Sequence, residues 1–424
     1  VSGFARAIGP RAFYHCESLA EIEFGLGGTG DLSFAERAFW GCTSLKTLNL
    51  PNRLRGVEND YDAFQFGLKL AGGLSNPNAV MCFSKYDGRD CAAVESINVE
   101  EGGLYFSSYD GALYTAGRKM LVFCPQQKSG TITIAKEAET FRVGCFWNCQ
   151  ILSAIEFEEG GTADFELPSV SGSFTYTTDA LFYNCYKLSS IAFPARLVKI
   201  GDNALYWGEA IAGRSNHNIS VVTFAPDCRL NEIGKSAFKN CKIKEIELPA
   251  SVTAIGSSAF SGCLSLKKIV VPDGIERIEG NMFGDCTSLT EVVLPSTLKE
   301  IRGMAFLGCI VLENIELPES VTAIGSIAFG GCSSLKKIVV PTGVERIEGS
   351  TFVGCSNLTE VVLPSTLKEI MGMAFRNCEA LKTVVLPSSL KDIGKGAFSN
   401  CPLESVFFGG TEAKYPVSYT HLTL

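Results

Sequence analysis

The sequence has little charge and no long uncharged hydrophobic run. Charged residues make up 19% of the 424 residues, below the ~25% of a typical soluble domain. The net charge is −8, which argues against the clustered Lys and Arg of a phosphate-binding surface, so we expect no nucleic-acid partner. No apolar stretch approaches the ~18 residues of a membrane span, so we expect no membrane insertion of this chain.

Histidine and recognisable catalytic motifs are also scarce. The three histidines, His15, His217 and His421, have no second ligand at metal-binding spacing, and no C-x-x-C occurs. No G-x-S-x-G, H-E-x-x-H, Walker or EF-hand pattern is present. The pairs Glu100/Glu101 and Glu158/Glu159 follow expected strand ends, so we interpret them as solvated loop charges. We therefore predict no catalytic residue, no cofactor, no metal and no enzymatic activity.

One glycine-rich segment satisfies a dinucleotide-binding pattern and needs an alternative explanation. Gly25–Gly30 (GLGGTG) follows an expected strand over residues 21–24, as G-x-G-x-x-G does in Rossmann folds. The next expected strand, Leu45–Leu50, offers no acid for a ribose. We therefore interpret the glycines as an enlarged loop.

Cysteine is abundant, and its spacing is regular. Hydrophobic residues make up 46% of the chain and there are 17 cysteines, a number that a chain of this length does not need for stapling. The motif F-x-x-C ends at Cys16, Cys42, Cys149, Cys185, Cys241, Cys263, Cys286, Cys309, Cys332, Cys355, Cys378 and Cys401, and the intervals from Cys263 onward are all equal. A fixed period of about 23 residues predicts a solenoid.

A longer period of three repeats lies over the shorter one. Leu289–Ile301 (LTEVVLPSTLKEI) returns letter for letter at Leu358–Ile370. This offset indicates that the C-terminal half grew by duplication of a three-repeat block. Such growth favours selection for length and surface.

A single unit is read from Leu266 to Cys286. Leu266–Val271 has the residues of a short strand, which Pro272 ends because proline cannot donate to a ladder. Ile275 and Ile278 form a second apolar pair, and Phe283 and Cys286 share one helical face. Stacked copies would bury these positions as ladders. Because ladder side chains point in parallel, we predict buried free thiols without disulfides.

Three segments resemble the BspA-like leucine-rich repeat family. Leu312–Cys332 (LENIELPESVTAIGSIAFGGC) matches its repeat L-x-x-I-x-L-P-x-x-V-x-x-I-G-x-x-A-F-x-x-C, Ser108–Pro125 its hairpin, and Phe408–Glu412 (FGGTE) its closing segment. The resemblance implies an α/β fold, a right-handed leucine-rich repeat solenoid with a parallel sheet of short strands. It also implies a secreted or cell-surface protein that adheres to host or neighbouring-cell proteins.

Departures from the repeat divide the chain into expected segments. We predict N-terminal repeats over 1–50, an irregular insertion over 51–96, a β-hairpin insertion and strand over 97–140, irregular repeats with long loops over 141–227, a regular array over 228–408 and a non-repeat tail over 409–424. Val1 lies inside a repeat, so we expect a capping unit or export signal upstream.

The strand register predicts which side chains face solvent. If Ile269 points inward, Lys268 and Val270 point outward, and the same register brings Lys268 beside Glu291 and Lys337 beside Glu360. The candidate protein-contact stripe is Val270, Val293, Glu316, Val339, Val362, Val385 and Phe407. An exposed apolar row often marks a binding site, although valine also recurs simply because it favours strands.

From these observations we expect a monomeric, non-enzymatic extracellular solenoid that binds a host-matrix or neighbouring-cell protein. A structural spacer within a larger surface protein is the alternative, since duplication lengthens the array.

Overall fold

The computed structural model describes residues 5–25, 30–34, 39, 41–56, 94–146, 148–170, 181–182, 184–206 and 218–409. Contacts divide the chain into two compact units: unit 1 holds Val1–Arg196 with Gly208–Asn218, and unit 2 holds Leu197–Trp207 with Ile219–Leu424. The segment boundaries expected from sequence stay predictions. Most of the insertion expected over 51–96, and the tail after 409, lie outside the described residues.

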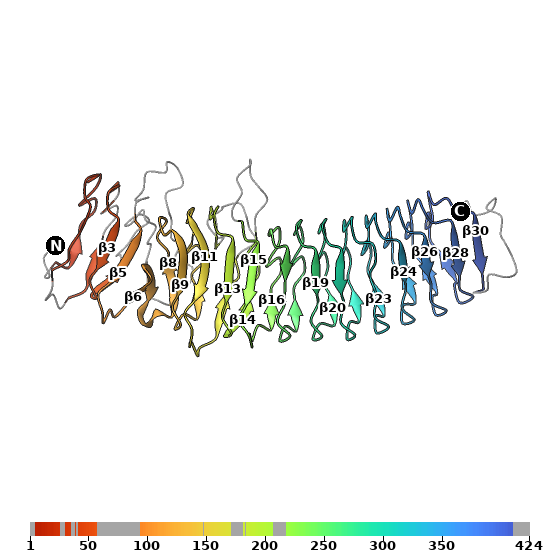
Figure 1. Ribbon diagram of the computed structural model, residues 1–424, viewed down its shortest axis with the longest axis horizontal. Helices are drawn as coiled ribbons and strands as arrows, with labels where there is room; N and C mark the ends of the chain where they lie inside the picture. The colour runs from red at the N-terminus through yellow and green to blue at the C-terminus, as the bar shows by residue number, and fades with distance from the viewer. Residues whose placement is uncertain are drawn as a thin grey trace. The chain divides into compact units, whose positions relative to one another are not determined.

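Unit 1 is built from short strands, most of them paired in parallel (Figure 1). They are β1 (Ala7–Ile8), β2 (Leu32–Phe34), β3 (Thr47–Leu50), β4 (Leu54–Gly56), β5 (Ser96–Val99), β6 (Phe106–Tyr109), β7 (Ala112–Thr115), β8 (Met120–Phe123), β9 (Gly130–Ile134), β10 (Thr140–Phe141), β11 (Leu152–Phe157), β12 (Phe165–Leu167) and β13 (Ser190–Phe193). Parallel pairing joins β1–β2–β4, β3–β5, β8–β10–β12 and β9–β11–β13.

Unit 2 continues with even shorter strands, which follow one another in chain order in Figure 1. They are β14 (Leu197–Ile200), β15 (Val221–Phe224), β16 (Glu232–Ile233), β17 (Glu245–Ile246), β18 (Ala254–Ile255), β19 (Lys268–Val270), β20 (Arg277–Ile278), β21 (Glu291–Val293), β22 (Glu300–Ile301), β23 (Ala323–Ile324), β24 (Lys337–Val339), β25 (Arg346–Ile347), β26 (Glu360–Val362), β27 (Glu369–Ile370), β28 (Thr383–Leu386), β29 (Asp392–Ile393) and β30 (Ser405–Phe408).

The regular repeats of unit 2 form two rows of parallel strands, and the repeat that begins at Leu312 contributes a strand to the second row only. First-row strands follow the cysteine and include β17–β19–β21, β24–β26 and β28–β30. Second-row strands follow the proline and include β14–β16–β18, β20–β22–β23 and β25–β27–β29. The predicted repeat solenoid is confirmed, and the apolar pair Ile275/Ile278 belongs to a second strand region that sequence did not predict.

The segment expected as one helical turn is a series of hydrogen-bonded turns instead. The amide of Cys286 donates to the Phe283 carbonyl three residues earlier, at 3.2 Å. The amide of Phe283 donates a hydrogen bond to the carbonyl of Ala305 in the next repeat at 2.9 Å. It therefore makes no helical hydrogen bond to the carbonyl four residues earlier. Among the described residues the structure has no α-helix, only a 3-10 turn over Ala116–Arg118. The α component of the expected α/β fold is therefore not found there.

Phenylalanine rings form the spine of unit 2. The rings from Phe238 to Phe398 stack one on the next through seven steps, with centroids 5.1–5.8 Å apart and interplanar angles of 5–17°. Offset stacking at this spacing adds to the burial of apolar area. Each ring therefore contacts its two neighbours, and a repeat in the middle is held from both sides.

The cysteine column runs beside the rings and makes a second link between repeats. The thiol of Cys286 donates to the carbonyl of Phe260 in the preceding repeat at 3.2 Å, and Cys309 and Cys332 repeat the contact at 3.2 Å each. Burial raises the pKa of Cys286 and Cys332 to about 12. The described cysteines are all unbridged, and only Cys16 and Cys401 among them are not buried, so the prediction of buried free thiols is confirmed for this part of the chain.

Glycine at the start of each turn allows the repeats to approach closely. A Cβ on Gly325 would lie 2.5 Å from the amide nitrogen of Gly303, closer than any side chain tolerates. This contact explains the I-G pair of the repeat, since a larger residue would push neighbouring turns apart.

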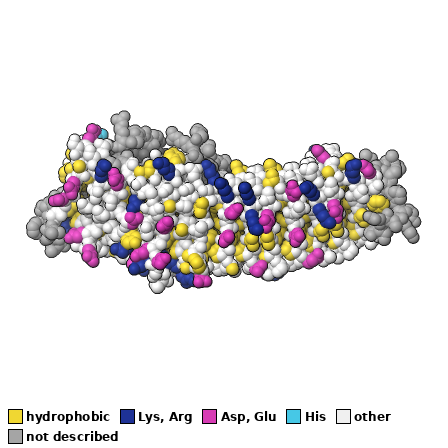
Figure 2. Space-filling view, viewed as in Figure 1, with side chains coloured by type: hydrophobic (Ala, Val, Ile, Leu, Met, Phe, Trp, Pro, Cys, Tyr) yellow, Lys and Arg dark blue, Asp and Glu magenta, His cyan; other side chains and the backbone are white. Residues whose placement is uncertain are grey.

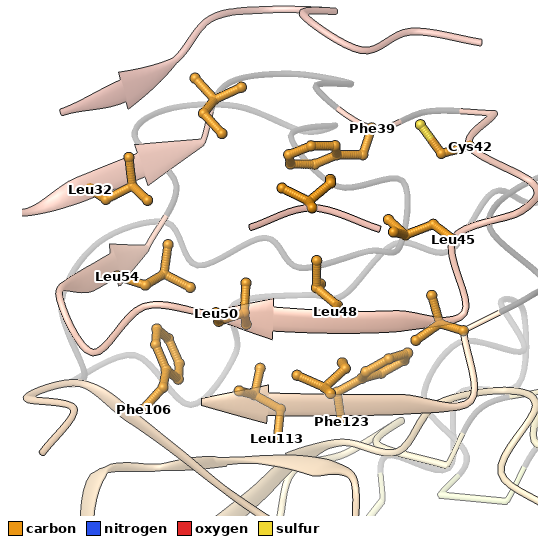
Figure 3. Close-up of a cluster of buried hydrophobic side chains, with 14 of the residues drawn as sticks. Leu32, Phe39, Cys42, Leu45, Leu48, Leu50, Leu54, Phe106, Leu113 and Phe123 are labelled. Carbon is orange, nitrogen blue, oxygen red and sulfur yellow. The ribbon is translucent and has the colours of Figure 1, made fainter. Parts of the chain in front are cut away.

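Unit 1 buries a comparable core, but a hairpin interrupts its repeats. Leucines 32, 45, 48, 50 and 54 pack with Phe39 and Cys42, and this cluster extends to Phe106, Leu113 and Phe123 of the hairpin region (Figure 3). Strands β6, β7 and β8 pair antiparallel, which confirms the predicted hairpin.

A tight turn and one carboxylate fix the hairpin to the following strand. Asp110 and Gly111 close the β6–β7 turn with φ of 47° and 72°. The carboxylate of Asp110 accepts hydrogen bonds from Lys128 Nζ at 2.6 Å and from the amide of Thr133 in β9 at 2.8 Å. Asp110 of the Ser108–Gly111 segment (SYDG) therefore fixes the hairpin to the chain that follows it.

Candidate functional site

The outward side of the first-row strands in unit 2 is the candidate site. In β19, β21, β24 and β26 the central residue is buried and the residues on either side are exposed. This alternation follows from the two-residue period of a strand with one buried face. Paired strands are in register, with Lys268 opposite Glu291 and Val270 opposite Val293. The predicted register is therefore confirmed.

Four of the seven residues in the predicted stripe are strongly exposed valines. Val270 is 48% exposed, Val293 and Val339 44%, and Val362 41%, all on the outward side of one unit. We call Val270, Val293, Val339 and Val362 the outer valine row. Hydrophobic side chains lie among charged ones on the face of unit 2 seen in Figure 2.

The other three residues of the stripe differ from the outer valine row. Glu316 is exposed but lies in a segment to which no strand is assigned. Val385 and Phe407, opposite each other in β28 and β30, are half-buried, whereas the neighbouring Phe408 is 48% exposed. The stripe is thus two exposed valine pairs followed by a partly covered end.

Opposite charges accompany each valine pair. Lys268 Nζ lies 2.6 Å from Glu291 Oε1, and Lys337 Nζ lies 2.7 Å from Glu360 Oε1, so both predicted pairs are present. All four side chains are about half exposed, and such pairs contribute little to stability. These ion pairs matter for recognition instead, because they place a fixed pattern of positive and negative groups beside exposed apolar groups.

A further row of charges precedes the strands. Lys336 Nζ lies 2.6 Å from Glu313 Oε2, and Lys382 Nζ lies 2.9 Å from Glu404 Oε1. The hydrogen bond from Lys382 to Glu404 raises the pKa of that ammonium group. Both pairs place further charges on the exposed side of the array, next to the strands that carry the valines.

Sequence analysis missed one component of the pattern, Glu247. It lies one repeat before Val270, directly after β17, and is exposed at the same position of the repeat. Glu247 and Glu316 are three repeats apart, and each precedes one valine pair. The three-repeat period was the signal that could have identified it.

The other residues weighed for chemistry do not come together. His15 is exposed, with Nδ1 3.5 Å from Glu17 Oε1, while His217, His421 and most of Gly25–Gly30 lie outside the described residues. The Glu100 carboxylate accepts a hydrogen bond from the backbone amide of Asn52 at 3.3 Å, and the Glu158 carboxylate accepts one from the backbone amide of Lys136 at 3.2 Å. Both therefore cap neighbouring loops.

Neither an ion site nor a membrane-spanning helix is found in the described part of the chain. There, no group of three or more His, Cys, Asp or Glu side chains is arranged to hold a metal ion. None of the helical segments described has the length and apolar content needed to cross a membrane.

The repeat pattern, the paired strand rows and the buried Phe and Cys columns agree with a family model. A model described as BspA type leucine rich repeat region matches residues 5–106, 121–212, 209–313 and 299–415 in six copies. The chain belongs to the BspA-type leucine-rich repeat family. Members of this family are repeat scaffolds, and the expected resemblance is confirmed. No curated protein matches the chain significantly.

Three solved structures are similar to this BspA-type chain. A leucine-rich repeat protein from Bacteroides ovatus ATCC 8483 is 24% identical, over 71% of this chain and 84% of that one, with a TM-score of 0.41. A leucine rich cell surface protein from Faecalibacterium prausnitzii A2-165 is 17% identical, over 97% and 90%, with a TM-score of 0.39. The pneumococcal vaccine antigen PcpA is 13% identical, over 96% and 90%, with a TM-score of 0.40.

Proposed function

We propose that this chain is a non-enzymatic protein-binding solenoid at the cell surface or outside the cell. Its partner is a protein of the host matrix or of a neighbouring cell, bound on the outward side of the first-row strands in unit 2. The observation that carries the proposal is the outer valine row, exposed at 41–48% between charged side chains. Apolar centres with polar rims are typical of protein interfaces.

The strands under this face are anchored by buried side chains, which suits the face to recognition. Ile269 and Ile338, between the outward residues, are fully buried, and the Phe column behind them is continuous. A face that is anchored in this way should lose little conformational entropy on binding, so even modest contacts contribute to affinity.

A triple substitution tests the proposal. Val339→Asp, Val362→Asp and Val385→Asp together introduce three carboxylates on the face without touching the buried residues between them. We expect capture of purified candidate partners, first identified from host-matrix and cell-surface extracts, to fall at least about tenfold, since charge on a desolvated contact costs binding free energy. Circular dichroism should stay unchanged.

A matched control removes similar apolar area elsewhere. Leu264 and Ile310 are 58% and 44% exposed in turns outside the strands. The variant with Leu264→Asp and Ile310→Asp should bind like the parent chain. Unchanged capture by the triple variant would show that the valine face is not the contact surface.

The second candidate function is a spacer or scaffold within a larger surface protein. The duplicated block supports it, because Leu289–Ile301 and Leu358–Ile370 are identical and lengthen the array by three repeats. A parent chain that captures no protein from either type of extract would favour the spacer.

A further inference from the structure

The outward face of unit 2 has a charge order that is complementary to itself when reversed. A half-turn about an axis parallel to the strands, passing between β24 and β26, lays one copy over another with the repeat order reversed. The exposed residues at a given position of the repeat then face residues at the same repeat position in the second copy. We propose that this face binds a second copy of the same chain in this register. The inference rests on the proposed function, because it names a partner for the same surface.

The contacts nearest the axis combine charge and apolar complementarity. Lys337 faces Glu360 of the second copy, and Glu360 faces Lys337 of the second copy. Val339 and Val362 face each other in the same manner. All four side chains are 41–53% exposed in the single chain and therefore free to meet another surface. The existing Lys337–Glu360 pair becomes part of a four-membered network of alternating charge.

Contacts further from the axis are also free of like charges. Glu313 faces Lys382 of the second copy, while Glu316 faces Val385 and Val293 faces Phe407 of the second copy. Asn314 faces Thr383 of the second copy, and Glu291 faces Ser405 of the second copy. Both facing residues are neutral. The half-buried Val385 and Phe407 thus receive contacts at the edge of the overlap.

Like charges disfavour a second register of the same face. With the axis through Asn314, Glu313 and Glu316 each face themselves, and Lys244 faces Lys382 of the second copy. Like charges across an interface cost free energy and reject wrong registers. The duplicated charge pattern would allow both registers, and the acidic residues between the valine pairs exclude the second.

The size of the face predicts weak association. Six repeats at strand spacing span about 24 Å, and the exposed positions of each repeat span about 10 Å along the strand direction. The face therefore covers about 240 Å², well below the ~800 Å² per partner of a standard stable interface. Sheet twist also separates the outer rows, so the central contacts dominate. We expect dimers at high local concentration, as for chains crowded on a surface, and monomers when dilute.

Charge reversal in trans tests the proposal. Lys337→Glu and Glu360→Lys each create like charges at the axis, so each variant alone should self-associate at least about tenfold more weakly than the parent. Mixed together, the two variants restore both opposite-charge contacts, and the mixture should recover association. Sedimentation velocity of the full chain, up to about 1 mM and under reducing conditions, measures this.

The duplicated ion pair supplies the control. Lys268→Glu and Glu291→Lys make the same change in the same local geometry, but Lys268 lies outside the overlap and Glu291 faces serine. Both variants should associate like the parent. Equal weakening by these controls, no recovery in the mixture, or a parent that stays monomeric at about 1 mM would each overturn the inference.

The two proposals fail separately. Loss of partner capture in the valine triple variant, together with a monomeric parent, would leave the proposed function standing and remove self-association. Self-association without capture of any other protein would leave the dimer standing and remove the proposed binding of a host or neighbouring-cell protein.

Discussion

Unit 1 and unit 2 close the same turn with different donors. Two residues after the repeat proline, unit 2 has either a glycine, as at Gly274 and Gly343, or a short hydroxyl. Thr297 Oγ1 donates to the Ile275 carbonyl at 3.2 Å, and Ser320 Oγ donates to the Leu298 carbonyl at 2.6 Å. Unit 1 has Arg53 and Arg196 at this position, and both are buried. The same place in the repeat is thus filled by side chains of very different length.

The two buried arginines donate hydrogen bonds to carbonyls in the longer turns of unit 1. Arg53 Nη1 donates to the carbonyls of Ala5 at 2.6 Å and Gly30 at 3.0 Å. The guanidinium of Arg196 donates to the carbonyls of Ala138, Ala135 and Ala163, the last two at 3.3 Å. A longer loop leaves more carbonyls without strand partners, and buried carbonyls need donors. The irregular repeats at Arg53 and Arg196 therefore have a long side chain with several donors where regular repeats have a hydroxyl or a glycine.

The largest effect is expected in the ring column of unit 2. Phe306 is fully buried, with ring centroids 5.4 Å from Phe283 and 5.3 Å from Phe329. Phe306→Ala should cost about 3–5 kcal/mol, because it leaves a cavity and removes two stacking contacts. Hydrogen exchange should rise in the neighbouring repeats and stay unchanged in unit 1. A uniform rise across both units, or a cost below about 1 kcal/mol, would contradict a column that is held locally.

The next largest effect is expected in unit 1. Arg196→Ala should cost about 3 kcal/mol, because three carbonyls lose a charged donor. The packing of the guanidinium over Phe165, 5.5 Å from the ring centroid, is lost as well. Urea unfolding followed by hydrogen exchange over residues 135–167 measures the loss. Arg196→Lys should recover only part of it, since one ammonium cannot reach every carbonyl. Full recovery by lysine would show that charge alone matters.

The smallest effect is expected at the equivalent position in unit 2. Thr297→Ala removes one hydroxyl that is near the surface, so we expect a cost of about 1 kcal/mol. The same exchange experiment, read over residues 273–300, gives a direct comparison with Arg196→Ala. Equal costs at the two positions would remove the distinction between widened and regular turns.

Cysteine spacing predicts the solenoid and the outward face because every regular repeat has the same length. Once Ile269 is placed inward, a shift by whole repeats places Val292 and Val361 inward too, and their neighbours outward. Both ion pairs follow from this rule. The register is therefore a property of the period and needs no knowledge of tertiary contacts.

The second-row strands and the buried arginines could not be predicted in this way. Strands such as β20 and β22 have two residues each, too few to show an alternating pattern. Arginine is mostly exposed in proteins, and the carbonyls that bind Arg196 lie 33–61 residues away in sequence. The burial of these side chains depends on loop paths that the sequence period does not contain.

The thiols from Cys263 to Cys401 donate to a phenylalanine carbonyl of the preceding repeat, so their chemical reactivity can report when a repeat separates from its neighbour. A thiol such as Cys286 is buried and protonated, so an alkylating reagent added at neutral pH can modify it only while its repeat is open. A modification once made persists after the repeat closes. The modified cysteines, mapped one by one along unit 2, would therefore report how often each joint of the solenoid has separated.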